Sequence, residues 1–137
     1  MLINKFYKDE NDYHDFDSFK KGLNCLLKRE ENNAINEKND AKTGWDRFEA
    51  EVSLDAIQYG EMILQNSKSF KELEDVINKT FADLNDEKNR SSSASDVLSH
   101  RYTAEIMRFI RNQERDGYTK VAVFALKQQQ RKEAKQK

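Results

Sequence analysis

Hydrophobic side chains recur every three or four residues in three stretches of the chain, which is the spacing of one face of an α-helix. The first stretch covers residues 16–27 and follows two aspartates that can cap a helix. The second covers residues 70–84 and begins with a capping box, in which Ser69 and Glu72 can accept hydrogen bonds from the first amides. The third begins at Ser95 or Asp96, and its apolar face consists of Leu98, Tyr102, Ile106, Phe109 and Ile110.

Two other stretches have patterns typical of β-strands. Between residues 47 and 54, apolar side chains alternate with polar ones, although Glu and Ala in this stretch also favour a helix. A short helix is expected to follow, up to Asn66. Residues 118–126 are rich in β-branched and aromatic side chains and follow Asp116-Gly117, where the third helix is expected to end. The sequence therefore predicts an α+β fold with three to four helices and a small two-stranded antiparallel sheet from residues 46–54 and 118–126. An all-α fold is the alternative.

The polar stretches set the expected domain organisation. Residues 28–44, 85–95 and 128–137 lack an apolar periodicity and are predicted to be loosely held. In 137 residues the hydrophobic content of 36% is low, but eight Phe, five Tyr and one Trp can supply a core. We expect one domain at residues 1–127, followed by a basic polar tail at 128–137.

Charge is distributed unevenly behind a formal net charge of −1. Residues 1–66 carry nine basic and fourteen acidic side chains, whereas residues 67–137 carry fifteen and eleven. Such asymmetry is typical of proteins that bind nucleic acid or acidic proteins, although the two halves can also attract each other within the fold. The start of the chain lacks the apolar run of a secretory signal, and the longest apolar run, Val121–Leu126, is too short to span a membrane. A cytoplasmic location is therefore expected, with no membrane partner.

One segment resembles a known family of DNA-binding proteins. "EVSLDAIQ" at residues 51–58 and "SKSFKELEDVI" at residues 67–77 resemble the strand-to-helix junction and the second-helix entry of ribbon–helix–helix repressors. The resemblance, which covers residues 47–84, implies a strand that reads DNA in the major groove. It would place Glu49 and Glu51 there, facing the phosphates, and it has Asp55 where the family usually has proline. A nucleic-acid-binding transcriptional regulator is therefore kept as the alternative function.

Metal and catalytic motifs are not recognisable in the chain. An EF-hand starting at Asp9 would need glycine and glutamate where His14 and Lys20 stand. The two histidines are isolated, and Cys25, beside two leucines, is expected to be a small core residue. We therefore expect no bound metal, no cofactor and no enzymatic activity.

A row of basic residues on the third helix is the strongest candidate binding site. Four arginines lie within about 80° of one another on the helical wheel, beside the apolar face, with the small Ala104 between them. Arginine pairs with carboxylates or phosphates through two parallel hydrogen bonds. Basic residues of the tail are expected to extend this patch. The predicted partner-binding residues are Arg101, Arg108, Arg111, Arg115, Lys127, Arg131 and Lys132.

These observations favour binding over catalysis. The expected function is that of a non-enzymatic accessory protein that docks on a host protein or protein–nucleic-acid complex and modulates or inhibits it. The absence of proline and the abundance of Asn and Lys fit an AT-rich genome, such as that of many phages and plasmids. The identity of the partner and the oligomeric state are not encoded in any motif.

Overall fold

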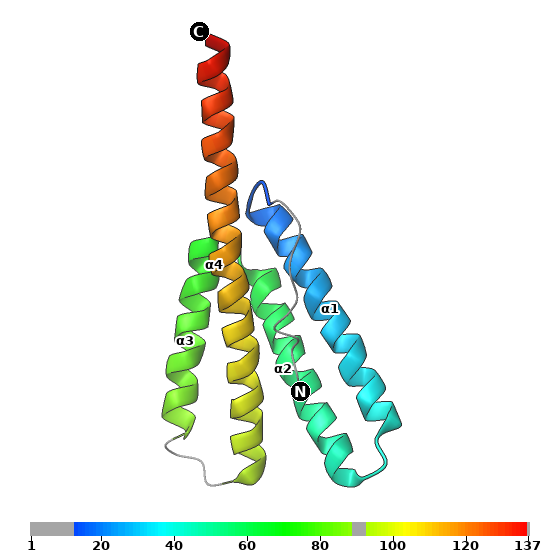
Figure 1. Ribbon diagram of the computed structural model, residues 1–137. Helices are drawn as coiled ribbons and strands as arrows, with labels where there is room; N and C mark the ends of the chain where they lie inside the picture. The colour runs from blue at the N-terminus through cyan, green and yellow to red at the C-terminus, as the bar shows by residue number, and fades with distance from the viewer. Residues whose placement is uncertain (1–12, 89–92, 137) are drawn as a thin grey trace.

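Four α-helices run alternately down and up along one axis in the computed structural model, which describes residues 13–88 and 93–136 (Figure 1). These helices are α1 (Phe16–Asp40), α2 (Gly44–Asn66), α3 (Phe70–Lys88) and α4 (Ala94–Gln136). No strand occurs in the described residues. The predicted α+β fold is therefore wrong, and the all-α alternative fits the structure.

Helix α1 is longer than its apolar pattern predicts. Asp15 caps it, accepting a hydrogen bond from the Ser18 amide at 2.8 Å, and the hydrogen bonds from Ser18 lower the pKa of the Asp15 carboxyl. The helix then continues to Asp40 through most of the stretch that we expected to be a loop at 28–44. It does so because Glu30 and Ala34 extend its buried face, so only residues 41–43 connect α1 to α2.

Helix α2 contains the first predicted strand. Residues 46–54 lie inside it, so the alternation of polar and apolar residues there is not that of a strand. Its buried residues follow a helical repeat that includes Ile57, and several of them are small: Ala50, Ser53, Ala56 and Gly60. A Cβ atom added at Gly60 would lie 2.7 Å from Cγ2 of Ile106, so the glycine allows α2 and α4 to approach closely.

Helix α3 forms where the sequence predicts it. The Glu72 amide donates a hydrogen bond to Ser69 Oγ at 3.1 Å, and the Glu72 carboxylate accepts one from the Lys68 amide at 2.8 Å. The capping interaction is thus confirmed, although the glutamate reaches back one residue further than expected. Leu73 and Ile77 are fully buried.

Helix α4 contains both the third predicted helix and the second predicted strand. The predicted apolar face is confirmed, because Tyr102, Ile106 and Ile110 are buried and the other two residues pack partly against the core. The helix does not end at Gly117, and residues 118–126 continue it as further helical turns. Gly117 is needed for close packing rather than for a turn, since an added Cβ would lie 2.4 Å from Cδ2 of Phe19.

The core lies between the helices, where α1 packs along α2 and α4 lies against the other three. By contrast, α2 and α3 make few contacts with each other. An aromatic cluster closes the end of the bundle from which α4 emerges. Phe70 packs edge-on against Phe16 and Tyr118, with ring centroids 5.0 and 5.6 Å apart, and lies beside Phe19. Beyond this cluster the last turns of α4 extend away from the other helices (Figure 1).

Candidate functional site

All seven residues predicted to bind a partner lie on α4, but they do not share one face. Lys127, Arg131 and Lys132 follow Arg115 by 12 to 17 positions in the chain. At about 3.6 residues per turn they are rotated by about 100–160° from it around the helix axis. The structure therefore divides the predicted patch into an arginine face beside α3 and a separate basic region on the last turns.

The four arginines differ in how far they are available. Arg101, Arg108 and Arg115 are exposed, and Arg101 Nε lies 3.9 Å from a carboxylate oxygen of Glu105 in the same helix. Arg111 is half-buried instead. Its guanidinium lies over the ring of Phe81, 4.8 Å from the ring centroid, and its Nε has no hydrogen-bond partner among the described residues. Arg111 thus helps to hold α3 against α4, and the other three remain for binding.

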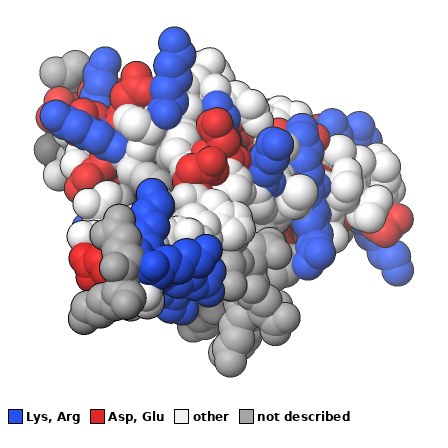
Figure 2. Space-filling view, turned by 90° about the horizontal axis from the view of Figure 1, so that it is seen from above, with Lys and Arg blue, Asp and Glu red and all other residues white. Residues whose placement is uncertain are grey.

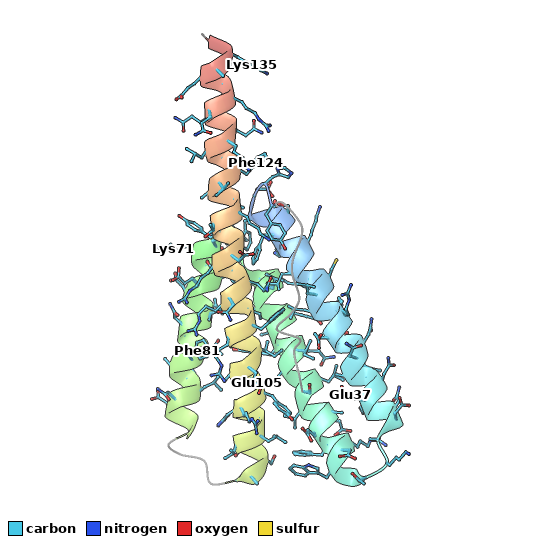
Figure 3. The ribbon with its side chains drawn as sticks, viewed as in Figure 1. Glu37, Lys71, Phe81, Glu105, Phe124 and Lys135 are labelled. Atoms are coloured by element: carbon cyan, nitrogen blue, oxygen red, sulfur yellow. The ribbon has the colours of Figure 1, made fainter. Side chains whose placement is uncertain are left out.

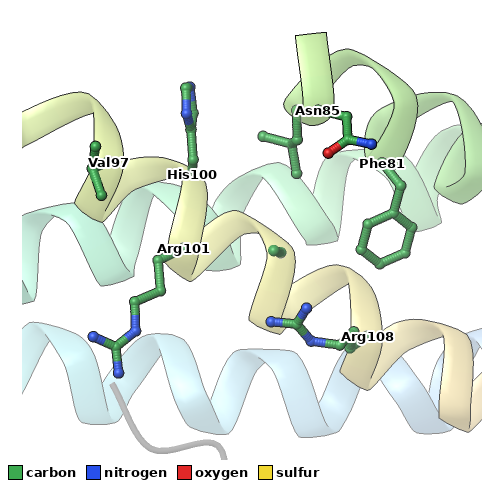
Figure 4. Close-up of a pocket in the computed structure, with 8 residues that line it drawn as sticks. Phe81, Asn85, Val97, His100, Arg101 and Arg108 are labelled. Atoms are coloured by element: carbon green, nitrogen blue, oxygen red, sulfur yellow. The ribbon is translucent and has the colours of Figure 1, made fainter. Parts of the chain in front are cut away.

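A groove of about 540 Å³ lies between α3 and α4, beside this arginine face. Figure 4 shows Phe81 and Asn85 on α3 opposite Val97, His100, Arg101 and Arg108 on α4. The apolar part of the lining also includes Leu84 and Ala104. Val97 is 55% exposed, so apolar surface at this site faces solvent. The sequence identifies Ala104 and the arginines, but it assigns Phe81 and Leu84 to the core. These two side chains line the groove because of the way α3 packs against α4.

The second basic region surrounds the point where α4 leaves the bundle. A groove of about 370 Å³ there is lined on α4 by Lys120, Lys127 and Arg131 together with apolar side chains, and on the α1 side by Tyr13 and His14. His14 packs edge-on against Phe124, with ring centroids 4.1 Å apart. Figure 3 shows Phe124 at this level and Lys135 further along the helix. Seen from this end, the molecule presents a compact group of Lys and Arg side chains (Figure 2).

Sequence reasoning missed a third surface. A groove of about 380 Å³ separates α2 from α3, and its apolar lining includes Tyr59, Met62 and Val76. Glu72 and Asp75 line it as well, and no lysine or arginine does. If residues 44–66 are read as a helix, Tyr59 and Met62 fall outside its buried face, and two exposed large apolar side chains indicate a binding surface.

Buried carboxyl groups lie between the helices, and their pKa values are shifted. Burial raises the pKa of Glu114 on α4, and nearby Glu74 on α3 raises it further. Burial also raises the pKa of Glu61, although the Lys28 ammonium lies 2.8 Å from its carboxylate and opposes this shift. These groups are enclosed by packed helices and do not open onto either basic groove.

The described residues contain no group of three or more His, Cys, Asp or Glu side chains that could hold a metal ion. Asp9, with which the rejected calcium loop would begin, lies outside the described residues. Cys25 is exposed, so the expectation that it belongs to the core is wrong. No helix in the described part of the chain is long and apolar enough to cross a membrane.

Comparison of the chain with protein-family models, with curated proteins and with solved structures finds no match to any of them. The ribbon–helix–helix resemblance is overturned by the fold itself. Residues 47–54, which would have to form its DNA-reading strand, are part of α2. The chemistry of the surfaces is therefore the only guide to function.

Proposed function

We propose that this protein is a non-enzymatic accessory protein that docks on another protein through the groove between α3 and α4. The observation that carries the proposal is the combination of an apolar lining with two exposed arginines, Arg101 and Arg108, in one groove. A partner segment with apolar side chains flanked by carboxylates has the matching chemistry. The groove lies on packed helices, so little conformational entropy is lost when a partner binds.

A protein partner suits this groove better than nucleic acid. Phosphates would be satisfied by the arginines alone and would leave the apolar surface of Phe81, Leu84 and Val97 uncovered. Charge on this face is also mixed, because Arg101 lies near Glu105. A transcriptional regulator with a ribbon–helix–helix segment does not fit, because residues 47–54, which would form its strand, are helical.

We also propose that the protein is encoded by a phage or plasmid and acts in a host cell. A chain of 137 residues without proline, rich in Asn and Lys and lacking catalytic motifs, fits a small phage- or plasmid-borne protein that acts in the cytoplasm of a host. It would modulate or inhibit the host protein on which it docks. Inhibition requires only that the docked helices cover a surface that the host protein needs.

Pull-down from host lysate with groove variants tests the proposal. Ala104→Glu introduces bulk and an acidic group beside the arginines, whereas Ala82→Glu makes the same change at an exposed position of α3 that does not line the groove. The wild type and Ala82→Glu should capture the same discrete protein after nuclease treatment, and Ala104→Glu should lose it. Arg108→Glu should weaken capture by about 10-fold or more, because like charges across an interface are costly.

Two results would contradict the proposal. If nuclease treatment removes every captured component from the wild type, the protein binds nucleic acid and not a protein. If Ala104→Glu captures the same partner as well as Ala82→Glu does, the partner binds elsewhere. Circular dichroism of both variants would establish that each remains folded and helical.

A further inference from the structure

The last turns of α4 present apolar side chains to solvent. Tyr118, Val123 and Leu126 are 60%, 44% and 56% exposed. Val123 and Leu126 are spaced three residues apart and so lie on one side of the helix. Lys127 and Arg131 follow Val123 by four and eight residues, so they border these two apolar side chains. This end of α4 is therefore an exposed apolar stripe with a positively charged border.

The groove between α2 and α3 has the complementary character. It combines apolar side chains, Tyr59, Met62 and Val76, with the carboxylates of Glu72 and Asp75. It exists because α4 packs between α2 and α3 on one side, so that these two helices have few contacts and leave a depression on the other. The depression is acidic and apolar, whereas the end of α4 is basic and apolar.

We propose that the occupant of the α2–α3 groove is the end of α4 from a second copy of this chain. An apolar helix face that lies in a groove between two helices is a common mode of recognition, and the opposite charges favour this pairing. The proposal concerns surfaces other than the α3–α4 groove and goes beyond the function proposed above.

The positions of the two surfaces favour a closed dimer. The groove is formed by the last turns of α2 and the first turns of α3, at the same end of the bundle from which α4 projects (Figure 1). Two copies that face each other end to end can therefore each place α4 in the other's groove. Residues 125–136 rise by about 18 Å along the helix, and residues 59–66 of α2 span about 10 Å, so the projecting part is long enough.

Sedimentation velocity of the full chain tests this pairing. The wild type should form dimers that dissociate on dilution and as salt is added. Leu126→Asp on α4 and Met62→Lys in the groove should each give monomers, because each places a repelling charge in the contact. Val97→Asp, the same kind of change at an exposed position near the other end of α4, should leave the dimer intact.

A mixing experiment distinguishes this contact from pairing of two α4 ends. An equimolar mixture of Leu126→Asp and Met62→Lys should recover dimers, since the first keeps an intact groove and the second an intact helix end. Dimers of Met62→Lys alone, a monomeric wild type at the highest soluble concentration, or a mixture that stays monomeric would each overturn the proposal.

Cysteine crosslinking gives a positive readout. With Cys25, the only cysteine of the chain, replaced by serine, Met62→Cys and Leu126→Cys chains should form a mixed disulfide on oxidation. A Val97→Cys chain should not crosslink to Met62→Cys. Equal crosslinking of both pairs would contradict the proposed contact, whatever the outcome of the pull-down through the α3–α4 groove.

Discussion

Residues 94–117 and residues 118–136 belong to one continuous helix but differ in how far their side chains are buried. The first part has a buried apolar side that includes Tyr102, Ile106 and Ile110. In the second part Tyr118, Lys120, Val121 and Phe124 still contact the rest of the molecule, and nearly every later side chain is exposed. One helix can therefore both stabilise the fold and carry an exposed surface. Matched substitutions in its two parts test this difference.

Truncation of core side chains should separate the two parts most strongly. Ile106→Ala should lower the free energy of unfolding by about 2–5 kcal/mol, because Ile106 is fully buried and leaves a cavity. Leu126→Ala should change it by less than about 0.5 kcal/mol, as is usual for exposed positions. Chemical denaturation in dilute protein measures both. A large loss for Leu126→Ala would mean that the end of α4 is part of the folded core.

A substitution of Gly117, at the boundary between the two parts of α4, should have the next largest effect on stability. Gly117→Ala should lower the free energy of unfolding by about 1–3 kcal/mol, since the new methyl group would overlap the buried ring of Phe19. Gly44→Ala is the control, because nothing lies within 4 Å of its added Cβ, and it should be neutral or stabilising by up to about 1 kcal/mol. A Gly117→Ala protein as stable as the wild type would show that α1 and α4 can move apart at no cost.

Arginine substitutions should give a smaller contrast. Arg111→Ala should cost about 0.5–2 kcal/mol of stability, because it removes the guanidinium from the Phe81 ring. Arg131→Ala, in the projecting part, should cost less than about 0.5 kcal/mol. Thermal unfolding of the two variants side by side checks the difference. Equal melting temperatures would mean that the contact of Arg111 with Phe81 does not stabilise the fold.

The smallest effect should appear in the pH dependence of stability. Because the pKa of Glu114 is raised above its usual value of 4.5 in the folded protein, this residue lowers stability as pH rises from that value through the raised pKa. Glu114→Gln should therefore be more stable than the wild type at about pH 7, and the difference should disappear at about pH 3. Glu133→Gln, on the exposed part of α4, is the matched control. A Glu114→Gln protein that is less stable at about pH 7 would mean that the carboxylate has a favourable partner.

The candidate site could be predicted only in part from the sequence. The arginines and Ala104 are visible on a helical wheel because a wheel needs only the spacing of residues in one helix. The second wall of their groove comes from α3, and the position of Arg111 over Phe81 also depends on α3. Spacing within α4 carries no information about either. The α2–α3 groove was missed for the same reason, since it arises where two helices fail to pack.

The sequence alone predicts the helices at 16–27 and 70–84 and the helix that begins at Ser95 or Asp96, because the strength of a capping box and of a three-and-four repeat is local. It did not determine residues 46–54 and 118–126, where local signals support two structures. In the first stretch an alternating pattern overlaps the helical set Ala50, Ser53 and Ile57, and the close contact of Gly60 with α4 favours the helix. In the second, Gly117 packs against Phe19 while remaining helical, and adding residues to an existing helix costs less than starting a strand with no neighbour to pair with. Contacts between distant segments select the helix in both stretches, because only such contacts can distinguish two local conformations of similar energy.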